Sequence, residues 1–125
     1  MVDLITDGLV RVLVVEDSAD QADLLRRYFE KAGCQVTTVE SAEDAIAAYE
    51  AEVHDLAVVD LQLPGMDGWQ LSIKLRTDRP GCAIAITSVL DTADFPEADA
   101  SLPKPFTGQQ IRDVLRLTVP AWSGQ

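Results

Sequence analysis

The chain has 125 residues, of which 47% are hydrophobic and 25% are charged, a size and composition typical of one folded globular domain. Its 21 acidic and 10 basic side chains give a formal net charge of −11, which disfavours direct binding to nucleic acid. No apolar run approaches the roughly 20 residues of a membrane span, and no basic residue lies in the first ten, where a secretory signal would carry one. We therefore expect a single cytoplasmic domain over residues 1–125, with its core at 11–118, no output domain and no contact with membranes or nucleic acid.

Histidine and cysteine are scarce, which limits the chemistry that the chain can perform. His54 is the single histidine, so His-based metal clusters and Ser–His or Cys–His catalytic pairs are excluded. Cys34 and Cys82 are too few for a zinc site, and they precede strands too distant for a disulfide, so we expect free thiols. Any chemistry must depend on carboxylates, hydroxyls and lysines.

The first predicted element is a strand at residues 11–15, an almost continuous apolar run of the kind that is buried on both faces of a parallel sheet. A helix follows, beginning at a capping box formed by Ser18 and Gln21 and ending at Gly33. A second strand is predicted at residues 35–39.

The next residues repeat this alternation of strand and helix. Ser41 begins a second helix, and the following strand at residues 56–60 is apolar until its last residue, which is an acid. A third helix follows Gly68 and stops before Pro80, and a fourth strand is predicted at residues 83–87.

A short strand at residues 100–102 and a last helix complete the chain. The last helix begins at a capping box formed by Thr107 and Gln110 and stops before Pro120. Strands that alternate with helices predict an α/β fold with right-handed crossovers and helices on both faces of a parallel sheet.

The connection at residues 88–99 departs from this pattern. Its length barely suffices for a parallel crossover with its helix, and Pro96 interrupts any continuous helix, while Phe95 is held away from helical geometry by the proline after it. We expect this fourth helix of the fold to be shortened to one turn or absent. The acidic residues of the connection are predicted to be solvated: Asp91, Asp94, Glu97 and Asp99.

Polar residues follow the ends of the predicted strands. The carboxyl ends of parallel strands share one edge of the sheet, and ligands of α/β proteins bind there. The residues placed at this edge are Glu16, Asp17, Asp60, Thr87, Ser88, Lys104 and Pro105.

Three carboxylates at one sheet edge repel one another, so a divalent cation is expected to neutralise them. Ligation by oxygen alone favours Mg²⁺, Mn²⁺ or Ca²⁺, and Mg²⁺ fits a site with a few carboxylates and open positions best. Lys104 adds a positive charge and Thr87 a hydroxyl donor. Together these groups indicate phosphoryl transfer, with Asp60 as the nucleophile.

The chain also resembles a known family, the receiver domains of two-component response regulators. The resemblance covers residues 12–117, and it implies a flavodoxin-like fold with strand order 2-1-3-4-5. It rests on four motifs in a specific order and spacing: Val14-Val15-Glu16-Asp17, residues 58–68 around Asp60, Thr87-Ser88, and Lys104-Pro105-Phe106.

The resemblance also implies the roles of the site residues. Asp60 is then the phosphoacceptor, Thr87 and Lys104 contact the phosphoryl group, and the bond between Lys104 and Pro105 is cis. The implied Mg²⁺ ligands are Glu16, Asp17, Asp60 and the backbone carbonyl of Gln62.

The leading hypothesis is a signalling switch that accepts a phosphoryl group from a histidine kinase or phosphotransfer protein and acts through contact with an unknown downstream protein. Such a domain is not a conventional enzyme, although it assists its own phosphorylation and dephosphorylation. A phosphatase of the haloacid dehalogenase type would need a second acid two residues after Asp60, where Gln62 stands. A receiver-like interaction module that works without phosphorylation is the remaining alternative.

One position departs from the family pattern. The family usually has an aromatic residue three positions before the lysine, and here that residue is Ser101. We therefore expect phosphorylation to order or reorient residues 88–99, and partner specificity to depend on this loop.

Overall fold

A five-stranded parallel sheet with the strand order β2-β1-β3-β4-β5 forms the centre of the molecule. The computed structural model describes residues 9–63, 67–90, 93, 95, 97–120 and 122. The elements in chain order are β1 (Val10–Val15), α1 (Ala19–Lys31), β2 (Cys34–Val39), α2 (Ala42–Ala51), β3 (Leu56–Asp60), α3 (Gly68–Asp78), β4 (Ala83–Ser88), β5 (Ala100–Pro103) and α4 (Gly108–Thr118).

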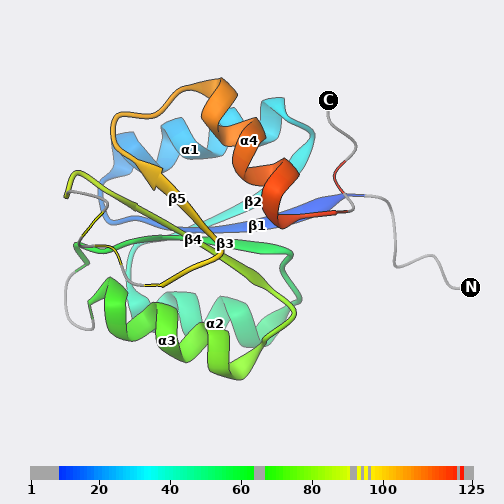
Figure 1. Cartoon of the computed structure of the whole chain (residues 1–125). Helices are drawn as coiled ribbons and strands as arrows, with labels where there is room; N and C mark the ends of the chain where they lie inside the picture. The colour runs from blue at the N-terminus through cyan, green and yellow to red at the C-terminus, as the bar shows by residue number, and fades with distance from the viewer. Residues whose placement is uncertain are drawn as a thin grey trace, which may run out of the picture.

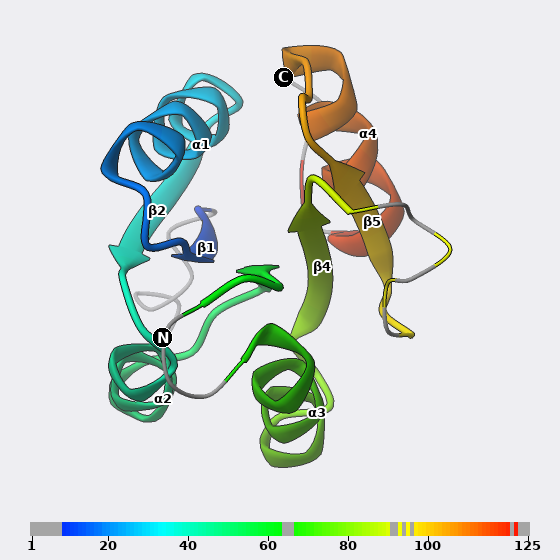
Figure 2. The ribbon, with the colours of Figure 1, turned by 90° about the vertical axis from the view of Figure 1, so that its left-hand side faces the viewer.

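The helices form one layer on each face of the sheet, so the molecule has three layers. Helices α1 and α4 cover one face, and α2 and α3 cover the other (Figures 1 and 2). All five predicted strands, the four predicted helices and the strand order are confirmed, with ends that differ by one or two residues.

Two hydrophobic clusters, one on each face, account for the apolar runs in the strands. Successive side chains of a strand point to opposite faces, so Val12 and Val14 pack with α1 and α4, whereas Leu13 and Val15 pack with α2 and α3. All four side chains are fully buried. This packing fixes the register of β1 and therefore the positions of the residues that follow it.

The connection between β4 and β5 contains no α-helix among its described residues, as the sequence predicts. Pro96, on which that prediction partly rested, lies outside the described residues, as do Asp91 and Asp94. Asp99 differs from the prediction because it is not simply solvated: its carboxylate accepts a hydrogen bond from the Ile84 amide at 2.8 Å and lies 3.6 Å from the Arg76 guanidinium. This side chain ties the end of the connection to the start of β4.

The helices begin where the sequence places capping residues, with one addition. Ser18, Ser41 and Thr107 cap α1, α2 and α4, and Thr107 forms the full capping box. Helix α3 is capped by Asp67, a residue to which the sequence analysis gave no role; its side chain accepts from the Gln70 amide. These caps place the first turns of α1 and α3 beside the carboxyl edge of the sheet.

Two features lie at the opposite edge of the sheet, where the strands begin. The indole of Trp122 donates a hydrogen bond to the Ala32 carbonyl at the end of α1, and the Arg116 guanidinium lies 5.6 Å from the centre of its ring. Cys34 and Cys82 are buried free thiols, as predicted.

None of the helices in the described ranges is long and apolar enough to cross a membrane.

Candidate functional site

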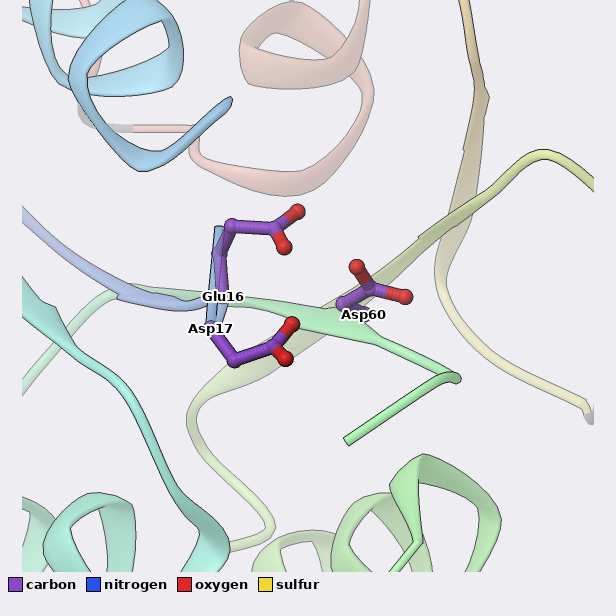
Figure 3. Close-up of side chains that lie close together, drawn as sticks. All are labelled: Glu16, Asp17 and Asp60. Atoms are coloured by element: carbon purple, nitrogen blue, oxygen red, sulfur yellow. The ribbon is translucent and has the colours of Figure 1, made fainter. Parts of the chain in front are cut away.

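Three carboxylates meet at the carboxyl edge of the sheet. Glu16 and Asp17 directly follow β1, and Asp60 is the last residue of β3, the strand that pairs with β1. One oxygen from each of the three carboxylates can be chosen so that all three lie within 4.8 Å of one another. Figure 3 shows Glu16 and Asp17 extending from the end of β1 toward the side of Asp60. Glu16 and Asp60 are buried and Asp17 is exposed, so the cluster opens to solvent on the Asp17 side.

Lys104 bridges the two buried carboxylates. Its ammonium donates hydrogen bonds to Glu16 Oε1 at 2.8 Å and to Asp60 Oδ2 at 2.9 Å. The lysine side chain is 13% exposed, so these are charge-assisted bonds in a largely desolvated place. The peptide bond between Lys104 and Pro105 is cis, which agrees with the expectation from the family resemblance.

The buried charges shift one another's proton affinities. Burial lowers the pKa of Lys104, but hydrogen bonds to Glu16 and Asp60 and their negative charges outweigh burial and raise that pKa above its usual value. Burial raises the pKa of Glu16, and the hydrogen bond from Lys104 offsets this only in part. The site therefore favours the charged form of Lys104, and it favours the protonated form of Glu16 more than water does.

The backbone around Asp60 holds its carboxylate in place. Asp60 Oδ1 accepts a hydrogen bond from the Gln62 amide at 2.8 Å. Helix α3 starts directly against this segment: a Cβ atom on Gly68 would lie only 2.3 Å from the Asp60 carbonyl oxygen. Glycine is required at position 68 because no side chain fits between the helix and the residue that ends β3.

Thr87 supplies a hydroxyl that has no partner. It lies opposite Asp60 in the pairing of β3 with β4, and it is fully buried. Its Oγ1 makes no hydrogen bond with any described residue. A buried hydroxyl without a partner is costly, so this group is available to a ligand oxygen placed beside Asp60.

The donor set at this edge fits a hard divalent cation. When all groups are ionised, the three carboxylates outnumber the single ammonium and leave two negative charges without a partner. Mg²⁺ prefers oxygen ligands and keeps several waters, which suits a cluster that is open to solvent at Asp17. The backbone amide of Gln62 donates a hydrogen bond to Asp60, which keeps Gln62 beside the cluster. The role of the Gln62 carbonyl as a metal ligand stays a prediction.

Every site residue predicted from the sequence lies at this edge, but three structural links were not foreseen. These are the bridge from Lys104 to Glu16, the close approach of Gly68, and the hydrogen bond from the Lys104 amide to the Ser88 carbonyl at 2.8 Å.

A hollow of about 350 Å³ also opens beside Lys104. It is lined by Gln21, Leu24, Val89, Lys104, Pro105 and Phe106.

The chain is similar to transcriptional regulators over most of its length. The transcriptional regulatory protein TcrA of Mycobacterium tuberculosis is 34% identical over 114 residues, a match that covers 86% of this chain and 45% of TcrA. The probable transcriptional regulatory protein TcrX of the same species is 32% identical over 114 residues, covering 86% of this chain and 48% of TcrX. The chain thus spans about half the length of the curated relatives it matches.

Solved structures show the same fold. The receiver domain (CheY-like) of a response regulator from Methylobacillus flagellatus superposes with a TM-score of 0.80 at 26% identity, covering 86% of this chain and 97% of that one. The signal receiver domain of a putative Luxo repressor protein from Vibrio parahaemolyticus gives 0.81 at 26% identity, covering 90% and 92%. The family model described as the response regulator receiver domain matches residues 12–116, a range that includes all the site residues above. The chain therefore belongs to the family of response regulator receiver domains.

Proposed function

We propose that this domain is a phosphorylation-dependent switch in which Asp60 accepts a phosphoryl group. Receiver domains are signalling modules of two-component systems, which makes this the first function to test. The observation that carries the proposal is the environment of Asp60, a buried carboxylate with the Lys104 ammonium at 2.9 Å and the unpartnered Thr87 hydroxyl on the neighbouring strand. This arrangement supplies a nucleophile, a positive charge and a hydrogen-bond donor at one place.

The donor is a phosphohistidine of a histidine kinase or phosphotransfer protein. A carboxylate oxygen of Asp60 attacks the phosphorus, an O–P bond forms, and the N–P bond breaks. The electron pair stays on the imidazole, which takes up a proton from water, and Asp60 becomes an acyl phosphate. Lys104 and Thr87 bind the oxygens of the transferred group, and attack by water later returns Asp60 to a carboxylate with release of inorganic phosphate.

The residues that would hold Mg²⁺ at this site are those of the acidic cluster: Glu16, Asp17, Asp60 and the backbone carbonyl of Gln62. The ion would supply positive charge that neutralises the carboxylates and the phosphoryl oxygens. Asp17, the exposed member, leaves the approach to the cluster open to solvent.

The output of the switch is contact with a downstream protein. The domain is not a conventional enzyme in this proposal, because it is itself the substrate, although it assists both the gain and the loss of its phosphoryl group.

Incubation with acetyl phosphate and Mg²⁺, followed by intact-mass and peptide mass spectrometry, tests the proposal. We expect one phosphoryl group on Asp60 in the wild type and none in Asp60→Asn. Asp67→Asn is the matched control, because Asn caps a helix about as well as Asp and this residue lies outside the acidic cluster. Equal labelling of Asp60→Asn and wild type would contradict the assignment.

A second candidate function is an interaction module that works without phosphorylation. It is favoured by the connection between β4 and β5, which has no helix among its described residues, and by Ser101, which is exposed on β5 where the family usually has an aromatic residue. Absence of any phosphoryl gain in the same assay, with Mg²⁺ bound, would support this candidate instead.

A further inference from the structure

A hollow between α1 and α4 carries positive charge on a strongly acidic protein. The two helices cover the same face of the sheet (Figure 2), and the hollow between them has a volume of about 250 Å³. Its described lining consists of Tyr28, Lys31, Ala32, Gly108 and Arg112. Two of these residues are basic and none is acidic, whereas acids outnumber basic residues by 21 to 10 in the whole chain. The hollow therefore has the opposite charge to the chain as a whole.

Neither cation of the hollow has an acidic partner among the described residues. Arg112 donates one hydrogen bond, from Nη2 to Oε1 of the neutral Gln109 side chain at 2.8 Å, and Lys31 makes no ion pair with the described part of the chain. Most other basic side chains do pair with carboxylates: Arg26, Arg27, Lys74, Arg76, Lys104 and Arg116. The two positive charges of the hollow are thus left for a ligand.

The acids next to these two cations in the sequence are engaged with other residues. Glu30 pairs with Arg26 along α1, and Asp113 pairs with Arg116 along α4. Both pairs join residues three or four positions apart, which are neighbours on the surface of a helix. The adjacent acids therefore do not neutralise the hollow.

The start of α4 brings a guanidinium and an aromatic ring together. A Cβ atom on Gly108 would lie 3.8 Å from Arg112 Nη1 and 3.8 Å from two carbons of the Tyr28 ring, so both groups lie over the first residue of α4. The Tyr28 ring also packs edge-to-face against Phe106, with the ring centres 6.0 Å apart. One wall of the hollow is therefore a packed aromatic ring beside a charged group.

These groups match the chemistry of a phosphate ester. A guanidinium presents its donors in a planar fork that suits two phosphate oxygens, and an ammonium adds a compact positive charge. The volume is several times the roughly 30 Å³ of one water, and it approaches the lower bound of about 300 Å³ for small-molecule pockets. The hollow therefore has room for a phosphate group and for a small organic group attached to it.

We propose that the hollow between α1 and α4 binds a small phosphate monoester, with the phosphate held by Lys31 and Arg112 and the organic group against the Tyr28 ring. None of the residues that line the hollow belongs to the acidic cluster around Asp60. The inference therefore does not depend on phosphorylation of Asp60. Because Lys31 is exposed and Arg112 is half-buried, we expect a dissociation constant of about 1 mM.

NMR of the backbone amides of the full chain, titrated with phenyl phosphate, measures this binding. The titration is made at constant ionic strength in EDTA, which keeps divalent cations from the acidic cluster. We expect saturable shifts at the amides of residues 108–112. Inorganic phosphate, which lacks the ring, should bind about threefold more weakly, and benzoate, which keeps the ring but carries one negative charge, about tenfold more weakly.

Variants separate the contributions of the three side chains. Arg112→Gln should weaken the binding of phenyl phosphate about tenfold, and Lys31→Gln about threefold. Arg27→Gln is the matched control and should bind as the wild type does, because it removes the same charge from α1 at an exposed residue that pairs with Asp23 outside the hollow. In Tyr28→Leu, phenyl phosphate should lose its advantage over inorganic phosphate.

Three results would overturn the proposal. Shifts that do not saturate, or equal weakening by Arg27→Gln and Arg112→Gln, would indicate general attraction of anions to positive charge. Saturable shifts at Asp60 and Thr87 but not at residues 108–112 would place the anion at the acidic edge. Equal affinities for phenyl phosphate and benzoate would show that the hollow does not select phosphate. The acetyl phosphate assay tests the proposed function separately, so failure of either proposal leaves the other standing.

Discussion

Strand β3 has an aspartate at each end, and the two carboxylates have different partners. Asp55, just before the strand, accepts a hydrogen bond on its carboxylate from the Arg11 amide at 2.8 Å, and its own amide donates one to the Arg11 carbonyl at 2.8 Å. Asp60, at the other end, is bound by the Lys104 ammonium and lies beside the unpartnered Thr87 hydroxyl. Asp55 joins β1 to the start of β3. Asp60 is held by the Lys104 ammonium, a group that can also bind a ligand. Asp55 is half-buried and Asp60 is buried, so the two acids differ in burial as well as in the partners that give one a structural role and the other a chemical one.

Of the changes at the two ends of β3, removal of the Lys104 charge should lower the free energy of unfolding most. Lys104→Met leaves Glu16 and Asp60 buried together without a cation, so the free energy of unfolding without metal should fall by about 3 kcal/mol. Urea denaturation measures the loss, and millimolar Mg²⁺ should restore part of it. Lys74→Met, which removes an exposed lysine from α3, is the control and should change stability little. Equal stabilities of the two variants would show that the bridge contributes nothing.

Loss of the structural acid should cost less and leave phosphorylation intact. Asp55→Ala removes the acceptor of the Arg11 amide and should lower the unfolding free energy by about 1–2 kcal/mol. Asp55→Asn keeps an acceptor oxygen and should lose less. Both variants should take up one phosphoryl group from acetyl phosphate as the wild type does; failure of either while folded would contradict the separation between the two ends.

Stabilisation by Mg²⁺ should depend on the carboxylates around Asp60 and not on Asp55. Mg²⁺ at about five times its dissociation constant should raise the unfolding free energy by about 1 kcal/mol, a shift of a few degrees in melting temperature. Asp17→Asn, which removes the exposed carboxylate of the cluster, should reduce this shift, whereas Asp55→Asn should retain it. A shift that is the same in Asp17→Asn would place the ion elsewhere.

His54 gives the smallest expected effect, at the same end as Asp55. Both of its ring nitrogens are buried, neither has a hydrogen-bond partner in the described part of the chain, and the Glu52 carboxylate lies 3.6 Å from Nε2. Burial lowers the pKa of His54 below its usual value near 6.5. The unfolded chain therefore binds the proton more tightly, so this contribution to stability is complete above about pH 6.5 and is lost as the pH falls.

The His54 effect can be isolated by substitution. His54→Phe keeps a ring beside Tyr49 and cannot titrate, so its stability should depend less on pH between about pH 5 and 7 than that of the wild type. One titrating group changes the slope by at most about 1.4 kcal/mol per pH unit. Identical pH profiles of the two proteins would show that the pKa of His54 is the same in the folded and unfolded states.

The sequence predicts most of the fold and the composition of the site because both depend on local patterns. Apolar runs predict the buried strands, and an acid at the end of such a run marks Asp60. The bridge from Lys104 to Glu16 joins residues 88 positions apart and depends on the geometry of three strand ends. The tie from Asp99 to Ile84 likewise depends on how the connection returns to the sheet. Such contacts follow from packing, which no local pattern encodes.

The two tryptophans lie at opposite edges of the sheet. Trp69 follows Gly68, where an added Cβ would lie 2.3 Å from the Asp60 carbonyl oxygen, and Trp122 is bonded to the end of α1 beside the strand starts. Indole emission depends on the local field and on nearby quenching groups, so the two rings act as separate optical probes. Trp122→Phe leaves a single tryptophan in the first turn of α3, and Trp69→Phe leaves one beside the end of α1. Each edge of the domain can therefore be followed in real time by its own emission, without any attached dye.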